Sequence, residues 1–374
     1  MADNKDKKVL NVPALRFPEF TEGWATKSIS DLATVIGGGT PDTTVKSYWN
    51  GDIQWFTPSE IGKNKYVDLS LRTITEEGLN NSNAKLLPPH TILLSSRATV
   101  GECSIALQEC ATNQGFQSLI AKNCDMDFLY YLIQTKKKEL IRKACGSTFL
   151  EISANEIRKI HTYVPSINEQ KKIGVLLSLI DKRIATQNKI IEKLETLIKG
   201  IIETVISSQK PNTLIKNCLE CNSSTLQESQ VAETGTFPVY GATGISGYTE
   251  TADVNGESIL IIKDGSGVGT VKYVTGEYSY IGTLNRLIAK DGYCLKYIYF
   301  ALQRFSFEPY KTGMAIPHIY FRDYGKAKIF CPTIEKQSVI AQKLSSIEDK
   351  VSVEKQILFY YQAQKSYLLS QMLI

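Results

Sequence analysis

Hydrophobic residues recur at steps of three and four along residues 166 to 207, with one step of seven centred on Gln187. This spacing is typical of a heptad seam, in which one narrow apolar stripe of a helix packs against a partner helix. The positions between the seam residues are mostly charged, so we predict a long helix that buries this stripe and exposes its other faces to water. The predicted seam residues of this helix are Ile173, Leu177, Ile180, Ile184, Gln187, Ile191 and Leu194.

The chain itself supplies the partner helix, because the same pattern returns 167 residues later. The motif PSINEQKKIGVLLSLIDKRI, at residues 165 to 184, aligns without a gap with PTIEKQSVIAQKLSSIEDKV, at residues 332 to 351. The chain is therefore an internal duplication. Because the second helix has to return along the first, we predict an antiparallel pair with Gln187 and Glu354 as a polar layer near its centre. The seam residues of the second helix are Ile340, Leu344, Ile347, Val351, Glu354 and Leu358.

A globular segment precedes each of the two helices. In the first, short β-like runs alternate with turn signals from Ser28 to Cys124, and residues 127 to 142 follow as one helix with an acidic start and a basic end. The second segment repeats this order, and the glycine turns at Gly146 and Gly313 correspond at the same offset. We therefore predict an α+β fold, in which two globular α/β domains are joined by two long antiparallel coiled-coil helices as a pseudo-two-fold internal repeat. The predicted boundaries are an N-terminal arm at 1–24, a first domain at 25–165, a first helix at 166–208, a second domain at 209–332 and a second helix at 333–374.

Composition adds little to this picture. The chain has 374 residues, of which 43% are hydrophobic and 22% are charged, and its formal net charge of +5 is compatible with a polyanionic partner without requiring one. No apolar run reaches the roughly 18 residues of a membrane span, so we expect a cytoplasmic protein with no membrane partner. The eight cysteines are scattered, and we expect them to be reduced. Cys218 and Cys221 have the spacing of metal ligands but lack a second pair, so we predict no metal site.

The sequence lacks the short motifs that carry enzyme chemistry. The stretch KDGSGVGT, which begins at Lys263, resembles a phosphate-binding loop, but β-branched and aromatic residues follow where such a loop needs a helix. We interpret it as a hairpin turn. The chain contains no GxxxxGKS/T motif, no Pro-Pro-aromatic tetrad of the DNA amino-methyltransferases, and no GxSxG or HExxH motif. We therefore predict no catalytic residue in this chain.

Both globular segments carry basic, polar and aromatic side chains at predicted turns. Lysine and arginine neutralise phosphates, and arginine, lysine, asparagine and glutamine can hydrogen-bond base edges. For each single residue, the alternative is an ordinary solvated surface role. The candidate DNA-binding residues of the first segment are Arg97, Thr99, Asn113, Gln114 and Thr148, and those of the second are Lys263, Asp264, Ser266, Arg286, Lys311, His318, Tyr320 and Arg322.

Two divergent globular segments that alternate with two similar heptad helices closely resemble the specificity subunit of type I restriction-modification enzymes. The motifs that carry the resemblance are LRFPEF in the N-terminal arm, ATNQGF at residues 111 to 116, the two glycine turns and the duplicated helical motif. The resemblance implies that each globular segment is a target recognition domain for one half of a split double-stranded DNA site. It also implies that the two helices pack together and hold the methyltransferase (modification) subunits.

The same resemblance implies that this chain is not an enzyme and needs no cofactor of its own. S-adenosylmethionine, ATP and magnesium would belong to the modification and restriction subunits. The two helices differ in one respect, because Lys365 stands where Ile198 stands in the first copy and Tyr360 and Tyr361 thicken the second helix. The two helices therefore need not offer equivalent docking surfaces.

Two other classes of protein stay open from the residues alone. A coiled-coil scaffold that binds other proteins rather than DNA would account for the seam but not for the basic turns in both segments. An enzyme with a pseudo-symmetric site between the two domains would need a nucleophile, a metal cluster or a cofactor loop, and the sequence marks none of them.

Overall fold

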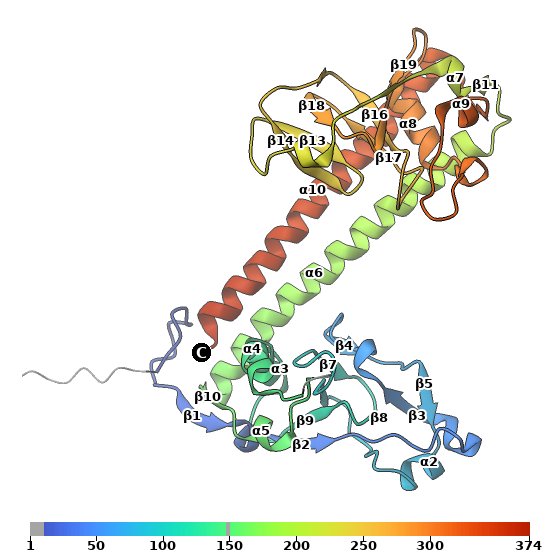
Figure 1. Ribbon diagram of the computed structural model, residues 1–374. Coiled ribbons are helices and arrows are strands. Elements are labelled where there is room, and N and C mark those ends of the chain that lie inside the picture. The colour runs from blue at the N-terminus through green and yellow to red at the C-terminus, as the bar shows by residue number, and fades with distance from the viewer. Residues whose placement is uncertain (1–10, 147–149) are drawn as a thin grey trace, which may run out of the picture. The chain divides into compact units, whose positions relative to one another are not determined.

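The structure is a computed structural model that describes residues 11–146 and 150–374 (Figure 1). The chain divides into two compact units. The first unit consists of residues up to 188 together with residues 357–374, and the second consists of residues 189–356. Each unit thus contains one globular domain and part of each long helix.

The two long helices follow the heptad pattern closely. Helix α6 spans Ile167–Ile202 and continues into a π-helical turn at Glu203–Ser207, and helix α10 spans Ile334–Met372. At 1.5 Å per residue, their 36 and 39 residues correspond to lengths of about 54 and 58 Å. In the first unit, Asp181 of α6 forms an ion pair with Lys365 of α10, and the guanidinium of Arg183, two residues later on α6, lies 5.8 Å from the ring centre of Tyr361, four residues earlier on α10. The contacts advance along α6 as they go back along α10, so the two helices run antiparallel there, as predicted.

The predicted seam residues are buried or half-buried in the structure. Gln187 is only 7% exposed and Glu354 is half-buried, but their mutual contact stays a prediction. The buried seam residues are Ile173, Leu177, Ile180, Gln187, Ile191, Leu344 and Val351, and the half-buried ones are Ile184, Leu194, Ile340, Ile347, Glu354 and Leu358.

The first domain is built from three sheets and several short helices. One strand pair closes the domain next to the long helix, and a five-stranded sheet and a three-stranded sheet form its body. In sheet order, the strands are β1 (Ala25–Ser28) with β10 (His161–Val164); β2 (Ala33–Gly37), β9 (Gln117–Ala121), β6 (Ile92–Leu94), β7 (Cys103–Ala106) and β4 (Tyr66–Val67); and β5 (Arg72–Ile74), β3 (Trp49–Phe56) and β8 (Cys110–Thr112). The helices are α1 (Ile29–Leu32), α2 (Glu76–Asn80), α3 (Met126–Thr135), α4 (Lys137–Lys143) and α5 (Ala154–Arg158), with 3-10 turns at Lys46–Tyr48 and Pro58–Glu60.

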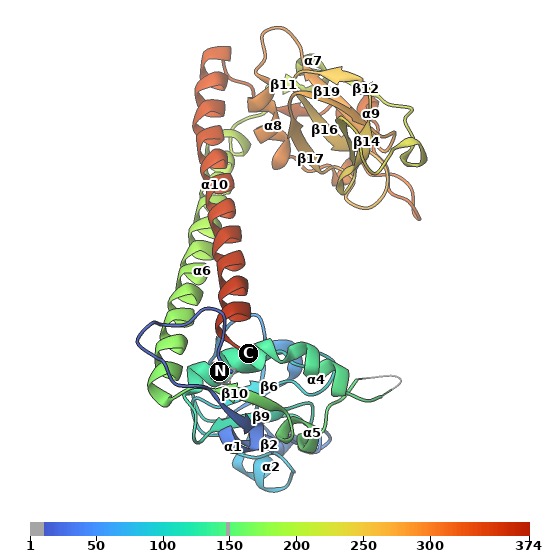
Figure 2. The ribbon, with the colours of Figure 1, turned by 90° about the vertical axis from the view of Figure 1, so that its left-hand side faces the viewer.

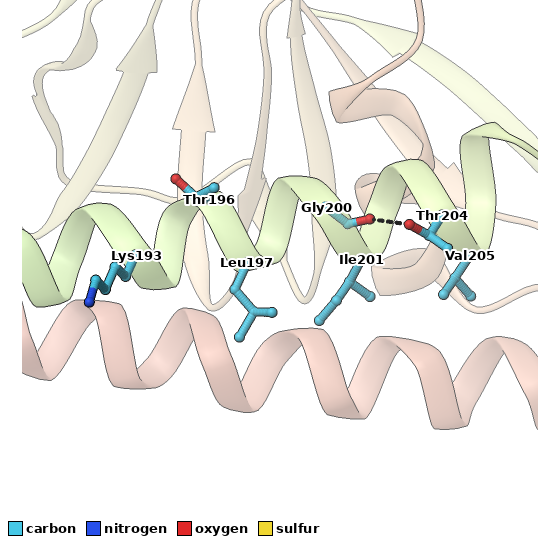
Figure 3. A pocket seen from close by; sticks show the side chains of 7 residues that line it. All are labelled: Lys193, Thr196, Leu197, Gly200, Ile201, Thr204 and Val205. Carbon is cyan, nitrogen blue, oxygen red and sulfur yellow. Dashed lines mark hydrogen bonds between the residues drawn. The ribbon is translucent and has the colours of Figure 1, made fainter.

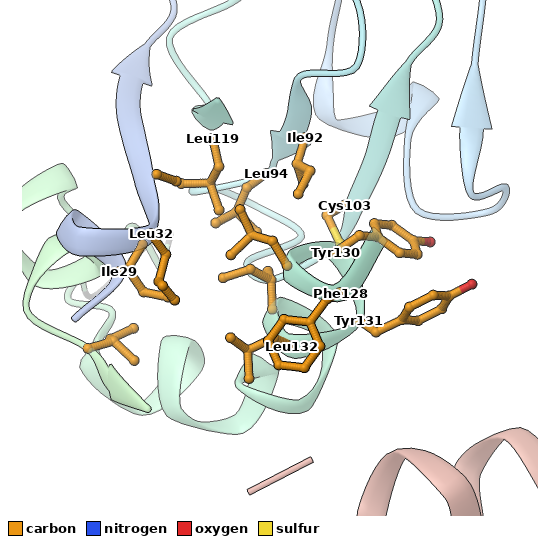
Figure 4. Packing of buried hydrophobic residues seen from close by; sticks show 14 of the residues in the cluster. Ile29, Leu32, Ile92, Leu94, Cys103, Leu119, Phe128, Tyr130, Tyr131 and Leu132 are labelled. Carbon is orange, nitrogen blue, oxygen red and sulfur yellow. The ribbon is translucent and has the colours of Figure 1, made fainter. Parts of the chain in front are cut away.

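Strand β6 separates two hydrophobic clusters of the first domain. Ile92 and Leu94 point to one face, where they pack with Phe128 and Leu132 of α3 (Figure 4). Leu93 points to the other face and belongs to a cluster that includes the ring of Phe56. Because side chains alternate along a strand, three consecutive apolar residues are explained by a sheet that is covered on both faces.

The single helix predicted at residues 127 to 142 is two helices, α3 and α4, and that prediction is wrong at Lys136. The amide of Lys136 is shared between the carbonyl oxygens three and four residues earlier, at 3.1 and 3.3 Å, and its ψ of 2° ends the regular helix. The apolar periodicity continues across this break, since Leu140 is fully buried like the residues of α3. Periodicity alone therefore could not reveal the break.

Residues from both ends of the chain complete the first unit. Arg16 of the arm donates Nε and Nη2 to the two carboxylate oxygens of the buried Glu169, at 2.7 and 2.8 Å. At the other end, Met372 and Leu373 are buried in the core of the first domain. The hydroxyl of Thr162 on β10 donates to the carbonyl of the adjacent Ile374 at 3.2 Å, and Figure 2 shows the end of α10 beside β10 and α4.

The second domain has the same plan with different sheets. In sheet order, its strands are β11 (Thr213–Leu214) with β20 (Lys328–Ile329); β12 (Leu219–Ser223), β19 (Leu284–Ala289), β16 (Ser258–Ile262) and β17 (Val271–Val274); and β14 (Gly244–Thr249), β13 (Phe237–Gly241), β18 (Glu277–Tyr280) and β15 (Val254–Asn255). The helices are α7 (Ile215–Cys218), α8 (Leu295–Gln303) and α9 (Phe321–Tyr324), with 3-10 turns at Glu228–Gln230 and Glu308–Tyr310.

A glutamine clamp shows that the duplication extends to individual hydrogen bonds. In the first unit, Gln170 accepts the amide of Asp125 at 2.9 Å and donates to the carbonyl of Pro165 at 2.9 Å. In the second unit, Gln337 accepts the amide of Cys294 at 3.0 Å and donates to the carbonyl at position 332 at 2.8 Å. Both glutamines are buried, and each ties the first turn of a long helix to the residue that precedes α3 or α8.

Candidate nucleic-acid interface

A tight hairpin at Thr312–His318 is the centre of the candidate interface in the second domain. The backbones of its two end residues exchange hydrogen bonds of 2.9 and 2.8 Å. Gly313 has φ of +89°, and a Cβ there would lie 2.3 Å from the carbonyl oxygen of Ile316. Only glycine therefore fits this position without moving the backbone.

A corresponding pair of backbone hydrogen bonds occurs in the first domain, where Cys145 and Glu151 exchange two bonds of 2.9 Å. Gly146 follows the first of these residues, with φ of +130°. Each predicted glycine turn therefore has a left-handed glycine directly after the residue whose backbone forms the closing bonds, and the two glycines are 167 residues apart. Thr148, a predicted site residue, belongs to this hairpin by sequence but lies outside the described residues.

The hairpin of the second domain is tied to the turn between β16 and β17. Asp264 forms a β-bridge with His318, and the amide of Gly265 donates to the carbonyl of Pro317 at 2.9 Å. The carbonyl of Lys263 accepts the amide of Ile319 at 2.9 Å. The structure thus brings the predicted residues Lys263, Asp264 and His318 together.

The prediction that the glycine-rich stretch is a hairpin turn is confirmed, since β16 and β17 are antiparallel neighbours on either side of it.

Aromatic and basic side chains continue this surface. The rings of His318 and Tyr320 lie edge to face with centroids 5.0 Å apart, and the guanidinium carbon of Arg322 lies 4.7 Å from the Tyr320 ring centre. Tyr320 is 44% exposed, so its ring and the cation above it are available to a ligand. Arg322 also lies 3.7 Å from the carboxylate of Asp323, which holds the guanidinium near this position.

The remaining predicted residues of the second domain have different surroundings. Lys311 precedes the hairpin and pairs with Glu308 at 2.6 Å. Ser266 is exposed in the turn between β16 and β17. Arg286 lies within the four-stranded sheet, on β19 between β12 and β16, and its Nε is buried without a hydrogen-bond partner among the described residues. It is therefore the candidate of this group that lies deepest in the fold.

In the first domain, Arg97 lies between the hairpin and a polar loop. It forms a β-bridge with Glu151, and its Nε lies 4.0 Å from the carboxylate of that residue. The side chain of Asn113 accepts the amide of Gly115 at 2.9 Å, and a Cβ on Gly115 would lie 3.7 Å from Cβ of Arg97. This loop thus packs on Arg97. Gln114 in the same loop accepts a hydrogen bond from the hydroxyl of Thr40.

Thr99 has a local role in the same region. Its hydroxyl donates to Oγ of Ser95 at 3.0 Å, and its amide donates to the carbonyl of Arg97 at 2.8 Å. The side chain thereby stabilises the turn that presents Arg97. Three of the predicted residues, Arg97, Asn113 and Gln114, gather beside the first hairpin, and Thr99 supports them.

Exposed apolar residues and one stacked pair in the two domains were not among the predicted site residues. In the first domain, the guanidinium carbon of Arg72 lies 3.6 Å from the ring centre of Trp49, and the neighbouring Leu69 and Leu71 are largely exposed. In the second domain, Met314 and Ile316 project from the hairpin. No periodicity marks the four apolar residues, since each lies outside the regular helices and strands, and Trp49 and Arg72 meet only because β3 pairs with β5.

A buried polar network anchors the first domain to the long helices. Nζ of Lys65, whose side chain is 8% exposed, lies 2.6 Å from the carboxylate of Asp127 and donates to Oγ of Ser178 at 2.5 Å. The hydroxyl of Tyr131 on α3 donates to the carboxylate of Asp181 on α6 at 2.6 Å. Burial, together with this carboxylate, raises the pKa of Tyr131, so the phenol keeps its proton and acts as the donor.

The second domain has a corresponding contact between a tyrosine of the domain and a carboxylate of the long helix. Burial raises the pKa of Tyr299 on α8 to about 12, and the carboxylate of Glu348 on α10 adds to this shift. Glu348 also accepts an ion pair from Lys296 at 2.9 Å. In both units, a tyrosine of the domain therefore meets a carboxylate of the long helix, which fixes how the domain is held on that helix.

The long helices expose more apolar surface than their seam requires. A shallow depression on α6 contains Leu197 and Ile201, which point toward α10 in Figure 3. Leu197 is 49% exposed, and Phe359 of α10 in the first unit is 64% exposed. The residues that line the depression are Lys193, Thr196, Leu197, Gly200, Ile201, Thr204 and Val205.

Among residues 11–146 and 150–374, no group of three or more His, Cys, Asp or Glu side chains is placed to hold a metal ion. None of the helices in the same ranges is long and apolar enough to cross a membrane.

The sequence model of the type I restriction modification DNA specificity domain matches residues 21–196 and again residues 217–359. The chain belongs to this family. The predicted resemblance is thereby confirmed, and each match contains one globular domain and most of the long helix that follows it. A type I specificity domain is thus present in two copies.

Individual proteins that are similar to this chain are also type I specificity subunits. The MjaIX type I restriction enzyme specificity subunit of Methanocaldococcus jannaschii is 39% identical over 179 residues, which is 46% of this chain and 41% of that protein. The EcoprrI specificity subunit of Escherichia coli is 24% identical over 357 residues, which is 86% of both chains. The solved structure of a type I restriction-modification S subunit from M. genitalium has the same fold, with a TM-score of 0.67 over 97% of this chain and 99% of that one, at 17% identity.

Proposed function

We propose that this chain is the DNA-recognition subunit of a type I restriction-modification complex, in which each globular domain reads one half of a bipartite site. The observation that carries the proposal is the duplicated hairpin with its polar surroundings. Arg97 and Asn113 lie beside the first hairpin, and Lys263, Tyr320 and Arg322 lie beside the second. Duplicated hairpins whose neighbouring residues differ are what two readers of different base sequences require.

We also propose that α6 and α10 dock methyltransferase subunits. Support comes from the exposed apolar residues on both helices, because surface of this kind is uncommon on a helix that packs only within its own chain. Under this proposal, the chain has no catalytic role of its own. S-adenosylmethionine would be bound by the modification subunits, and ATP and magnesium by the partner subunits that include the restriction subunit.

A salt titration separates DNA recognition from the alternative of a protein-binding scaffold. The complex of this chain with its methyltransferase subunit should bind duplexes that carry the methylated site of the host genome. Because binding releases counterions from phosphates, affinity should fall at least about 100-fold between roughly 50 and 200 mM salt. Binding that does not change with salt, or a complex that binds no DNA, would support the scaffold.

A domain exchange tests the two-reader arrangement directly. If residues 209–332 are replaced by those of a divergent relative, the methylated site should change in one half only. Mapping of methylated positions across the genome of cells that carry each variant gives the readout. A change in both halves would contradict two independent readers.

A further inference from the structure

The tip of the second hairpin is apolar, although basic and aromatic residues surround it. Met314 is 106% exposed, the highest fraction among the large apolar side chains in the described part of the chain, and Ile316 is 66% exposed. Met314 therefore gains nothing from packing within the domain, and Ile316 gains little. Lys263, Tyr320 and Arg322 lie on the surface behind them.

Backbone hydrogen bonds fix the main chain of the hairpin that presents these side chains. Two backbone hydrogen bonds close it between Thr312 and His318, and a third fixes Pro317 to the amide of Gly265. The left-handed conformation of Gly313 places the turn directly against the carbonyl of Ile316. A main chain that is already ordered loses little further conformational entropy when the hairpin binds a ligand.

The width of the hairpin selects the groove of DNA that could accept it. The major groove of B-DNA, which is about 12 Å wide, admits a two-stranded β-ribbon, whereas the minor groove is only about 6 Å wide. The apolar group in the major groove is the C5-methyl group of thymine.

We propose that Met314 and Ile316 contact thymine methyl groups in the major groove and thereby specify A·T pairs in the half-site of the second domain. The inference rests on the proposed function, and it adds the chemistry by which one half-site is read. The basic side chains behind the tip neutralise the phosphates on either side of the groove, while the two apolar side chains read the methyl groups.

Replacement of thymine by deoxyuridine tests this, because it removes the methyl group and keeps every hydrogen-bonding atom of the base pair. The assay uses the complex with the methyltransferase subunit and duplexes of the mapped site in which each thymine is replaced in turn. With the native chain, we expect at least one replacement in the second half-site to weaken binding about fourfold. With Met314→Ala or Ile316→Ala, binding to the thymine duplex should weaken similarly, and the same replacement should have no further effect.

Ile245→Ala is the matched control. Ile245 is 52% exposed on β14 of the same domain, so the substitution removes a comparable exposed side chain away from the hairpin. This variant should keep the full sensitivity to deoxyuridine. A second half-site without thymine, or equal sensitivity in the native and hairpin variants, would overturn the inference while DNA recognition stands. Loss of specific binding by the native complex itself would overturn the proposed function and the inference with it.

Discussion

A lysine in the apolar seam of a helix pair is destabilising unless its charge has a partner. Lys365 stands where Ile198 stands in the first copy, and the structure supplies the reason. Its Nζ lies 2.8 Å from Oδ1 of Asp181, whose other oxygen accepts the hydroxyl of Tyr131. The sequence shows that lysine replaces isoleucine here, but it does not show the ion pair, because Asp181 comes from the other helix and Tyr131 from the domain.

Removal of Asp181 should reveal this coupling. Asp181→Ala leaves Lys365 and the Tyr131 hydroxyl without their acceptor, so the free energy of unfolding should fall by about 3–5 kcal/mol. Lys365→Ile, which restores the residue of the first copy, should make Asp181→Ala less costly by about 1–3 kcal/mol. Urea unfolding of the two single variants and the double variant measures the coupling. The pair Glu195 and Lys355, whose side chains are 42% and 57% exposed, is the control and should couple by less than about 1 kcal/mol.

Gly313 allows a separate test at a single residue. Gly313→Ala adds a Cβ that would meet a backbone oxygen 2.3 Å away, whereas Gly276→Ala adds one at a similar φ, +91°, with nothing within 4 Å. Both substitutions carry the left-handed backbone cost of about 1–2 kcal/mol. Only Gly313→Ala should also open the hairpin, which hydrogen exchange at the amides of Thr312 and His318 would report. Equal protection of these amides in both variants would show that the close contact is relieved without opening.

At the scale of elements, heptad spacing predicted both long helices, while the strand order of the sheets could not be predicted. The seam from Ile173 to Leu194 is local, so three- and four-residue steps identify it. The parallel pairing of β3 with β8 joins Gln54 to Cys110, and no local pattern specifies such a distant partner. Arg97 and Asp264 were predicted only as turn residues, and the β-bridges that join them to Glu151 and His318 follow from no local pattern.

The glutamine clamps are the element-level contacts most open to test. Gln170→Ala leaves the amide of Asp125 and the carbonyl of Pro165 unsatisfied, and each buried orphan costs roughly 1–3 kcal/mol. We expect a loss of about 2–4 kcal/mol in the free energy of unfolding, and a similar loss for Gln337→Ala. Urea unfolding provides the measurement, with the exposed Gln342→Ala as a control that should change stability by less than about 0.5 kcal/mol. A clamp variant no less stable than this control would show that water replaces the lost contacts.

At the scale of the whole molecule, the proposed role of the helix pair as a spacer between two readers predicts that the pair can be lengthened in phase. One added heptad in each helix, between Ala185 and Asn188 and between Ser352 and Lys355, extends the pair by about 10 Å and keeps the seam in register. The gap between the half-sites should widen by roughly one to three base pairs, at about 3.4 Å each along the DNA axis. Genome-wide mapping of methylated sites is the readout. An insertion that changed the bases of either half-site would contradict a spacer role.

The burial of Met372 and Leu373 in the first domain has a consequence for how the protein is made. The second unit is one continuous stretch, residues 189–356, whereas the first needs residues 357–374. A ribosome therefore finishes every residue of the second unit before the core of the first is complete, which reverses the usual order in which domains mature during synthesis. Pulse proteolysis of ribosome-bound chains should show the second unit protected first. Until residues 357–374 have been synthesised, the core of the first domain lacks Met372 and Leu373 and stays partly exposed. Aggregation during translation should therefore start in the first unit.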